Sequence, residues 1–270
     1  MCHPQFCDFL SIASELGFVI SIQTNATLVD NFILKAVQSN HISDVSISLY
    51  SVTNSVHDSI TGISGSCAKT KQAIETLCNA GVRVSINAPI FLPNKNSMPE
   101  LKRFGDKMGL DVNFSLKIIP SQIPGKQTEN LNVFDEDFLR LCINDPEIRL
   151  YHRELPSIRN TSPSMRYCQT GFRSITFDSQ GNMLICNAFR KKCGSLLDYS
   201  LKELWENSAE LNLWRNKISL VNQKCHSCPA YAYCEPCPAH AYTLTGVANS
   251  IDPITCKFGF AFYNADSNHT

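Results

Sequence analysis

Cysteines in the C-terminal part of the sequence are the residues best suited to chemistry. Eight of the thirteen cysteines lie between positions 168 and 256. They are Cys168, Cys186, Cys193, Cys225, Cys228, Cys234, Cys237 and Cys256. An iron-sulfur cluster takes about four thiolates, so seven or eight thiols in two interleaved groups suit two clusters. A single zinc site takes about four ligands and would leave several of these cysteines over.

Local sequence around these cysteines predicts how they are brought together. Residues 173–177 and 183–186 flank a turn-rich segment containing Gly181, which predicts a β-hairpin that returns Cys186 to the end where Cys168 lies. The pairs Cys225–Cys228 and Cys234–Cys237 each place two sulfurs on one tight turn. Residues 200–207 are expected to form a short helix, with Trp205 as a core residue.

Composition limits the alternatives. Lys plus Arg equals Asp plus Glu at 24 each among 270 residues, so no basic field favours nucleic acid. The longest mainly apolar run, Leu16–Ile22, is too short to cross a membrane, and the N-terminus lacks signal-peptide features. We therefore expect a cytoplasmic protein, in which clustered thiols stay reduced and act as metal ligands.

The first 120 residues alternate strand and helix patterns, which is typical of a parallel sheet built from βα units. The expected strands are 18–24, 44–51, 82–90 and 111–119, and the expected helices are 28–39, 66–79 and 99–108. A further helix is expected at 135–143, and the domain boundary is placed at 155/156, giving domains 1–155 and 156–270.

All four expected strands alternate apolar and polar residues, unlike parallel strands that are covered on both faces. A barrel-like sheet with its polar face inward would enclose a hydrogen-bonding cavity, with ligands at the C-terminal strand ends. A sheet with one solvated face explains the alternation equally well. The first interpretation nominates Gln23, Asn25, Ser48, Asn87 and Lys117.

The cysteine pattern resembles the SPASM domain, which carries auxiliary 4Fe-4S clusters in radical S-adenosylmethionine (radical SAM) enzymes. Short motifs in the first half follow the order seen in radical SAM barrels. They are His3–Phe6, Leu16–Phe18, Gln23–Asn25, Ile47–Ser51, Val56–Asp58, Thr61–Gly65 and Val84–Asn87. The resemblance implies a fold with a partial (β/α) radical SAM barrel and a C-terminal cysteine-rich α+β SPASM module.

The resemblance also assigns residues to cofactors. It implies that Asn25, Ser48 and Asn87 lie near S-adenosylmethionine. It implies one cluster on Cys168, Cys186 and Cys237, and another on Cys225, Cys228, Cys234 and Cys256. Cys193 and Cys142 are the candidates for a fourth ligand of the cluster on Cys168, Cys186 and Cys237, whose fourth iron is otherwise left open.

One feature of the radical SAM pattern is missing. The sequence contains no Cys-x3-Cys-x2-Cys loop, which holds the catalytic cluster in the family. We therefore expect a barrel truncated at its N-terminus, in a chain that alone does not cleave S-adenosylmethionine. Cys2, Cys7, Cys67 and Cys78 are expected to be buried core thiols, and His57 to face the cofactor or the surface.

The resulting hypothesis is that the chain is part of a maturase, which modifies a peptide or protein and receives electrons from a flavodoxin or ferredoxin. In such enzymes, the resemblance implies, a 5'-deoxyadenosyl radical takes a hydrogen atom from the substrate. A non-catalytic iron-sulfur protein for electron transfer or docking is a second hypothesis, and a zinc-binding module a third. The substrate itself has no signature in the sequence.

Overall fold

The computed structural model describes residues 1–121, 127–145, 148, 168–217, 225, 227–234 and 236–267. The chain divides into two compact units. Unit 1 comprises Met1–Ile118, Leu131–Val133 and Pro146–Ile148, and unit 2 comprises Ile119–Asn130, Phe134–Asp145 and Arg149–Thr270. The domain boundary expected at 155/156 lies outside the described residues.

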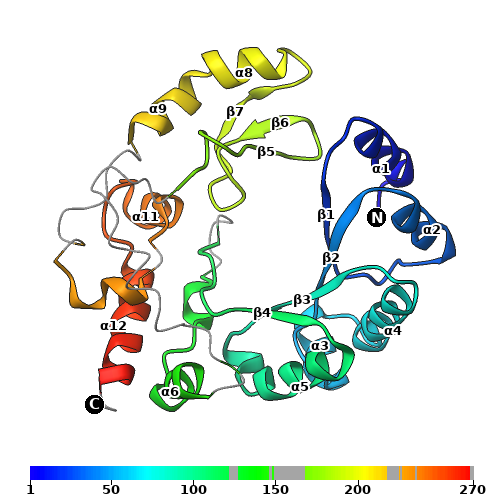
Figure 1. The fold of residues 1–270 in the computed structure, drawn as a ribbon. Coiled ribbons are helices and arrows are strands. Elements are labelled where there is room, and N and C mark those ends of the chain that lie inside the picture. The colour runs from blue at the N-terminus through cyan, green and yellow to red at the C-terminus, as the bar shows by residue number, and fades with distance from the viewer. Residues whose placement is uncertain are drawn as a thin grey trace. The chain divides into compact units, whose positions relative to one another are not determined.

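Unit 1 is built on a four-stranded parallel sheet with the order β1-β2-β3-β4, which confirms the predicted βα architecture (Figure 1). The strands are β1 (Ile20–Thr24), β2 (Ile42–Ser48), β3 (Val84–Pro89) and β4 (Asp111–Ser115). The helices are α1 (Phe6–Glu15), α2 (Asn31–Ser39), α3 (Asn54–Thr61), α4 (Ser66–Asn79), η1 (Leu92–Ser97) and α5 (Met98–Met108).

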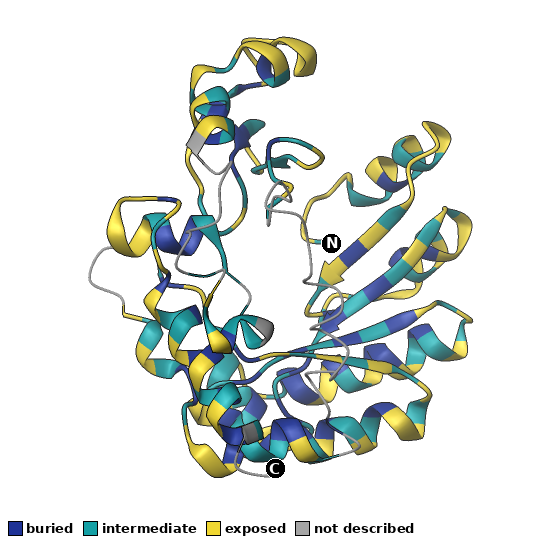
Figure 2. Ribbon diagram, turned by 60° about the vertical axis from the view of Figure 1, so that its left-hand side comes forward, coloured by how far each residue is buried: buried dark blue, intermediate teal, exposed yellow. Residues whose placement is uncertain are grey.

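The helices of unit 1 cover one face of this sheet, and burial alternates along β2 and β3 accordingly (Figure 2). Val45, Ile47 and Ile86 are fully buried on the helix side, where removal of their apolar surface from water stabilises the fold. Gly105 lets α5 approach the sheet, since a Cβ atom there would lie 2.3 Å from Val112 Cγ2. The opposite face carries the polar residues of the strands.

Unit 2 contains a three-stranded antiparallel sheet with the order β5-β6-β7. Strands β5 (Thr176–Phe177) and β6 (Asn182–Leu184) form the predicted hairpin, and β7 (Lys192–Ser195) adds a strand that the sequence analysis missed. The helices are α6 (Glu136–Asn144), α8 (Leu201–Asn207), α9 (Ala209–Lys217), η3 (Pro229–Tyr233), α11 (Pro238–Thr245) and α12 (Pro253–Ser267). A short turn, η2 (Glu129–Leu131), spans the change of unit along the chain.

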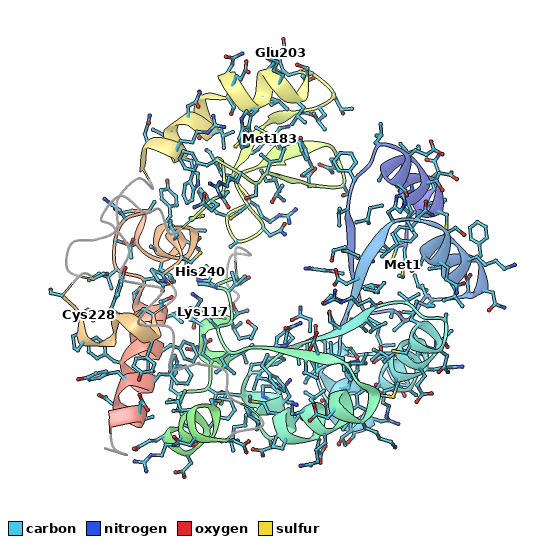
Figure 3. All side chains as sticks on the ribbon, viewed as in Figure 1. Met1, Lys117, Met183, Glu203, Cys228 and His240 are labelled. Atoms are coloured by element: carbon cyan, nitrogen blue, oxygen red, sulfur yellow. The ribbon has the colours of Figure 1, made fainter. Side chains whose placement is uncertain are left out.

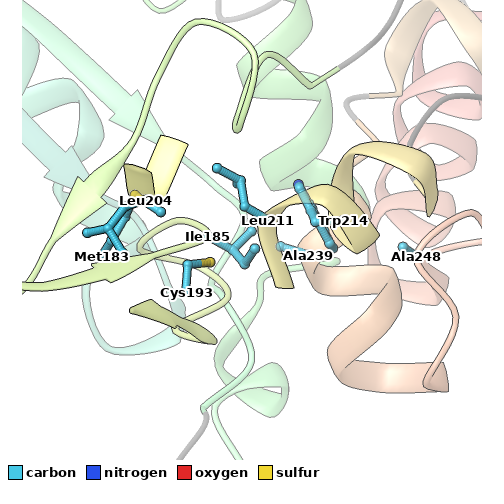
Figure 4. Close-up of a cluster of buried hydrophobic side chains, with 8 residues drawn as sticks. All are labelled: Met183, Ile185, Cys193, Leu204, Leu211, Trp214, Ala239 and Ala248. Carbon is cyan, nitrogen blue, oxygen red and sulfur yellow. The ribbon is translucent and has the colours of Figure 1, made fainter. Parts of the chain in front are cut away.

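A hydrophobic cluster forms a core of unit 2 (Figure 4). Its members are Met183, Ile185, Cys193, Leu204, Leu211, Trp214, Ala239 and Ala248. Trp205, which the sequence analysis placed in the core, is only half-buried and packs against this cluster, whereas Trp214 is a buried member of it. The side-chain oxygen of Ser200 caps the predicted helix by accepting a hydrogen bond from the Glu203 N–H, which is a strong helix-start signal.

The expectation of four buried N-terminal cysteines is partly wrong. Cys67 is buried, but Cys2 is exposed and Cys7 and Cys78 are half-buried. Cys2 precedes the first helix, so no second element covers it. Within the described residues, no helix has the length and apolar character needed to span a membrane.

Candidate metal centres

Three thiols gather beside the hydrophobic cluster of unit 2, and we call them the first centre. Cys168, Cys186 and Cys237 all pack half-buried against the cluster. Burial raises the pKa of the Cys186 thiol, and the nearby thiols of Cys237 and Cys168 raise it further. Charge on one of these sulfurs is therefore felt by another, although up to 69 residues separate them in sequence. The fold thus brings together the set that the resemblance implied.

A tight turn presents the sulfur of Cys186. The backbone N–H of Phe189 donates to Cys186 Sγ at 3.2 Å. Hydrogen bonds from the backbone of Phe189 and Ala188 lower the Cys186 pKa, against the larger effect of burial. N–H groups aimed at sulfur stabilise the thiolate form, which is the form that binds metal. This turn is suited to a ligand.

The loop after Cys168 is fixed by Arg215 on α9. Arg215 Nε donates to the Gly171 carbonyl oxygen at 2.6 Å, and its Nη1 donates to the Trp205 carbonyl oxygen at 2.7 Å. Gly171 has a φ of 81°, which favours glycine. Because the guanidinium group joins this loop to α8 and α9, it fixes the segment that carries Cys168.

Cys237 lies directly before α11, where Pro238 occupies the first turn. The Cys237 carbonyl oxygen accepts the N–H of Ala241 at 3.0 Å, as the carbonyl of an N-cap residue does. The short connection from Cys234 to Cys237 therefore ends in a helix start, which fixes the backbone direction at Cys237.

A second set of thiols, which we call the second centre, lies around η3 and the start of α12. Burial raises the pKa of Cys225, and the thiols of Cys256 and Cys228 raise it further. Burial, then Cys228 and Asp252, raise the pKa of Cys256. Cys228 precedes η3 (Figure 3). Cys228 therefore lies close to both Cys225 and Cys256.

Cys234 contacts α12, the helix that carries Cys256. Its Sγ lies 3.9 Å from the Thr255 carbonyl oxygen, next to Cys256 in sequence. A Cβ atom at Gly259 would lie only 2.2 Å from Cys234 Sγ, so glycine leaves the space that the sulfur fills. The Cys234 thiol is therefore seated against the helix turn that carries Cys256.

A buried contact joins α11 to the segment that precedes α12. His240 on α11 and Asp252 before α12 are 3% and 5% exposed, with Nδ1 and Oδ2 3.6 Å apart. The Asp252 carboxylate also accepts the backbone N–H groups of Ile254 and Thr255 at the start of α12. Asp252 thereby fixes the helix start from which Cys256 projects.

Cys193 and Cys142 are placed differently. Burial raises the pKa of Cys193 to about 11, and its thiol donates to the Lys191 carbonyl oxygen over 3.8 Å. Burial raises the pKa of Cys142 on α6 to about 12. No other cysteine contributes to either shift among the described residues. Both thiols are buried.

The thiol sets suit a cluster by their donor chemistry, since soft thiolates with N–H donors to sulfur are the ligands of iron-sulfur clusters. In the described part of the chain, no group of three His, Cys, Asp or Glu side chains is spaced to hold one metal ion. A zinc ion holds its thiolates about 2.3 Å away. Each thiolate of a 4Fe-4S cluster binds a different iron atom, so its four thiolates stand farther apart.

The polar face of the unit 1 sheet aligns several of the nominated side chains. Ser48 lies opposite Asn87 in the β2–β3 register, and Asn87 lies opposite Asn113 on β4. This row of three polar residues was incomplete in the sequence analysis, which missed Asn113 because only strand register reveals it. Gln23 belongs to a neighbouring row, opposite Ser46. Lys117 follows β4 in the chain (Figure 3).

Asn25 and His57 have local structural contacts. The Asn25 side-chain oxygen accepts the N–H of Thr27 at 3.2 Å and so forms a turn after β1. His57 is buried and its Nδ1 accepts the Tyr50 N–H at 3.2 Å. Burial lowers the His57 pKa. The expectation that His57 faces the surface is therefore wrong, because the ring is enclosed under the loop after β2.

Comparisons with known proteins match part of unit 2 to an iron-sulfur family. Residues 168–229 match the SPASM family model, described as an iron-sulfur cluster-binding domain. The chain is 24% identical over 239 residues to the antilisterial bacteriocin subtilosin biosynthesis protein AlbA of Bacillus subtilis strain 168, covering 86% of this chain and 53% of AlbA. It is 21% identical to the PqqA peptide cyclase of Gluconobacter oxydans strain 621H, covering 94% of this chain and 74% of the cyclase.

Solved structures share the fold. The structure of anSMEcpe with bound AdoMet matches with a TM-score of 0.69 at 17% identity, covering 93% of this chain and 73% of anSMEcpe. Streptococcus suis SuiB bound to S-adenosylmethionine matches with a TM-score of 0.66 at 17% identity, covering 92% of this chain and 62% of SuiB. The predicted fold class and the resemblance to radical SAM/SPASM proteins are confirmed. The chain spans about half the length of AlbA.

Proposed function

We propose that this chain is the cluster-holding part of a radical SAM peptide or protein maturase. Unit 2 would hold two auxiliary 4Fe-4S clusters, one on each centre. The observation that carries this proposal is the grouping of the thiols: Cys168, Cys186 and Cys237 pack against one hydrophobic cluster, and the thiols of Cys228 and Cys256 raise the pKa of Cys225. When bound, such clusters accept electrons or anchor a substrate.

The residues of unit 2 supply the setting for that chemistry. Backbone N–H groups at the Cys186 turn stabilise negative charge on sulfur. The hydrophobic cluster behind the first centre excludes water from one side of it, which strengthens electrostatic interactions there. Arg215 holds the Cys168 loop in place.

Unit 1 would contribute hydrogen bonds to S-adenosylmethionine in a complete enzyme. The support is the polar row of Ser48, Asn87 and Asn113 together with Asn25 after β1. Amide and hydroxyl groups suit the ribose and amino-acid groups of that cofactor because they both donate and accept hydrogen bonds.

A peptide or protein is the proposed substrate class, with a flavodoxin or ferredoxin as reductant. The support comes from the relatives: PqqA peptide cyclase, a protein of subtilosin biosynthesis, and SuiB solved with its precursor peptide SuiA.

Two cysteine variants test the two-cluster assignment. In anaerobically reconstituted protein, Cys186→Ala should remove one cluster, about four irons, and leave the second centre loaded. Cys228→Ala should do the reverse. Cys78→Ala is the matched control, because Cys78 lies on α4 in unit 1 and should leave both clusters intact. Equal iron loss in both cysteine variants and the control would contradict the proposal.

A non-catalytic iron-sulfur protein is the second candidate, favoured by the lack of a Cys-x3-Cys-x2-Cys loop in this sequence. We expect that the 270-residue chain with both clusters loaded does not form 5'-deoxyadenosine from S-adenosylmethionine under reducing, anaerobic conditions. A longer form of the protein, extended by upstream sequence that contains a Cys-x3-Cys-x2-Cys loop, should form 5'-deoxyadenosine under the same conditions. Formation of that product by the chain alone would overturn the expectation, and its absence in the longer form would favour the second candidate.

A further inference from the structure

The indole nitrogen of Trp214 is a buried donor with no hydrogen-bond acceptor among the described residues. The Trp214 side chain is 3% exposed and belongs to the hydrophobic cluster of unit 2. Leaving a buried N–H without an acceptor destabilises a fold, and buried indoles normally find a partner. An acceptor is therefore expected beside this ring.

The neighbours of the ring locate that acceptor. Each of the three segments that carry a thiol of the first centre contributes a residue to its surroundings. A Cβ atom at Gly171, three residues after Cys168, would lie 3.6 Å from Trp214 Cδ1, the carbon bonded to the indole nitrogen. The Phe189 ring, in the Cys186 turn, lies 5.5 Å from the Trp214 ring between centroids. Ala239, two residues after Cys237, belongs to the same cluster (Figure 4).

Among the described residues, most side chains packed around the ring offer carbon, and no described atom accepts from the indole N–H. Leu211, Ala239 and the Phe189 ring are apolar, and the Gly171 carbonyl oxygen already accepts from Arg215. A cluster held by the neighbouring thiols would add sulfur atoms that carry negative charge. Sulfur atoms of this kind accept N–H hydrogen bonds, and such bonds tune cluster potentials.

We propose that Trp214 Nε1–H donates a hydrogen bond to a sulfur atom of the iron-sulfur cluster on Cys168, Cys186 and Cys237. This hydrogen bond raises the reduction potential of that cluster. This inference rests on the proposed function, since it requires that cluster. The physical reason is that a reduced cluster carries more negative charge, so a donor favours the reduced form. The Phe189 N–H on Cys186 Sγ acts in the same direction.

Trp214→Phe tests the inference, because it keeps an aromatic ring and removes the N–H. The measurement is an EPR-monitored redox titration of the full, reconstituted chain. We expect the midpoint potential of one cluster to fall and that of the other to stay unchanged. Trp205→Phe is the matched control. Trp205 packs half-buried against the same hydrophobic cluster of unit 2, but its ring faces the Arg215 guanidinium group, which lies 4.5 Å from the ring centroid. The control variant should leave both potentials unchanged.

A second readout needs no loss of the N–H. In wild-type protein carrying indole-15N tryptophan, pulsed EPR should detect nitrogen coupled to one reduced cluster, and the coupling should persist in Trp205→Phe. Absence of coupling in the wild type, or unchanged potentials in Trp214→Phe with both clusters loaded, overturns the inference and leaves the proposed function standing. Wild-type protein that binds no iron and sulfide overturns both.

Discussion

Cysteine side chains in unit 2 have two distinct environments. In the two centres, neighbouring thiols raise the pKa values of Cys186 and Cys225. Cys193 and Cys142 are buried in apolar surroundings, with pKa values raised to about 11 and about 12. The thiolate is the form that binds metal, so a thiol with a pKa so far above neutrality is a poor ligand unless metal binding offsets the free energy of its deprotonation.

Replacing these two core thiols tests whether the first centre has three protein ligands. Cys193→Ala and Cys142→Ala should both retain two clusters, although each loses some packing. The first cluster should then have an exchangeable iron position, so a thiol-containing peptide should change its EPR signal in wild-type protein. Loss of the first cluster in Cys193→Ala would show instead that Cys193 is its fourth ligand.

Helix α12 places Cys256, and its packing against Cys234 depends on one glycine. Replacing Gly by Ala within a helix normally stabilises it by about 1 kcal/mol. At Gly259 the sign should reverse, because the new Cβ would lie 2.2 Å from Cys234 Sγ and close to the Ala230 carbonyl oxygen.

We therefore expect Gly259→Ala to displace Cys234 and to reduce iron bound at the second centre, while the first centre stays loaded. Asn264→Ala is the matched control, since Asn264 is exposed on the same helix. Iron and acid-labile sulfide measured after reconstitution check this result. Full occupancy of both centres in Gly259→Ala would show that Cys234 does not depend on this packing.

Element prediction from the sequence succeeded where periodicity is strong. Helix α4 has the predicted bounds Ser66–Asn79, and the alternating strands of unit 1 were recognised. Strand β7 was missed because Lys192–Ser195 is short and contains Gly194, where a Cβ atom would lie 2.3 Å from Leu204 Cδ2. That glycine serves close packing, which the sequence does not reveal.

Site prediction was limited by long-range geometry. Cysteine spacing indicated two interleaved groups of thiols, and the resemblance to SPASM domains implied which thiols belong to each; the assignment stays a prediction. The alignment of Asn113 with Asn87 follows only from strand register. The buried indole of Trp214 was not distinguished from Trp205 because both lie on helical segments with similar composition, and burial depends on contacts with distant residues.

At the scale of the whole molecule, the two units carry different parts of the proposed chemistry. Unit 1 offers a parallel sheet with a polar face, and unit 2 offers two sets of thiols. The chain covers 62–73% of the two matched structures and 53% of AlbA. Similarity of fold supports the proposal, but function depends on what the two centres bind.

Metal and sulfide content of the wild-type chain tests the central claim most directly. After anaerobic reconstitution, two 4Fe-4S clusters require about eight irons and about eight acid-labile sulfides per chain, with visible absorbance typical of clusters. Stoichiometric zinc without sulfide would contradict the account and favour a zinc-binding module. About four irons that disappear completely in Cys228→Ala would contradict it as well, because they would leave the first centre without a cluster.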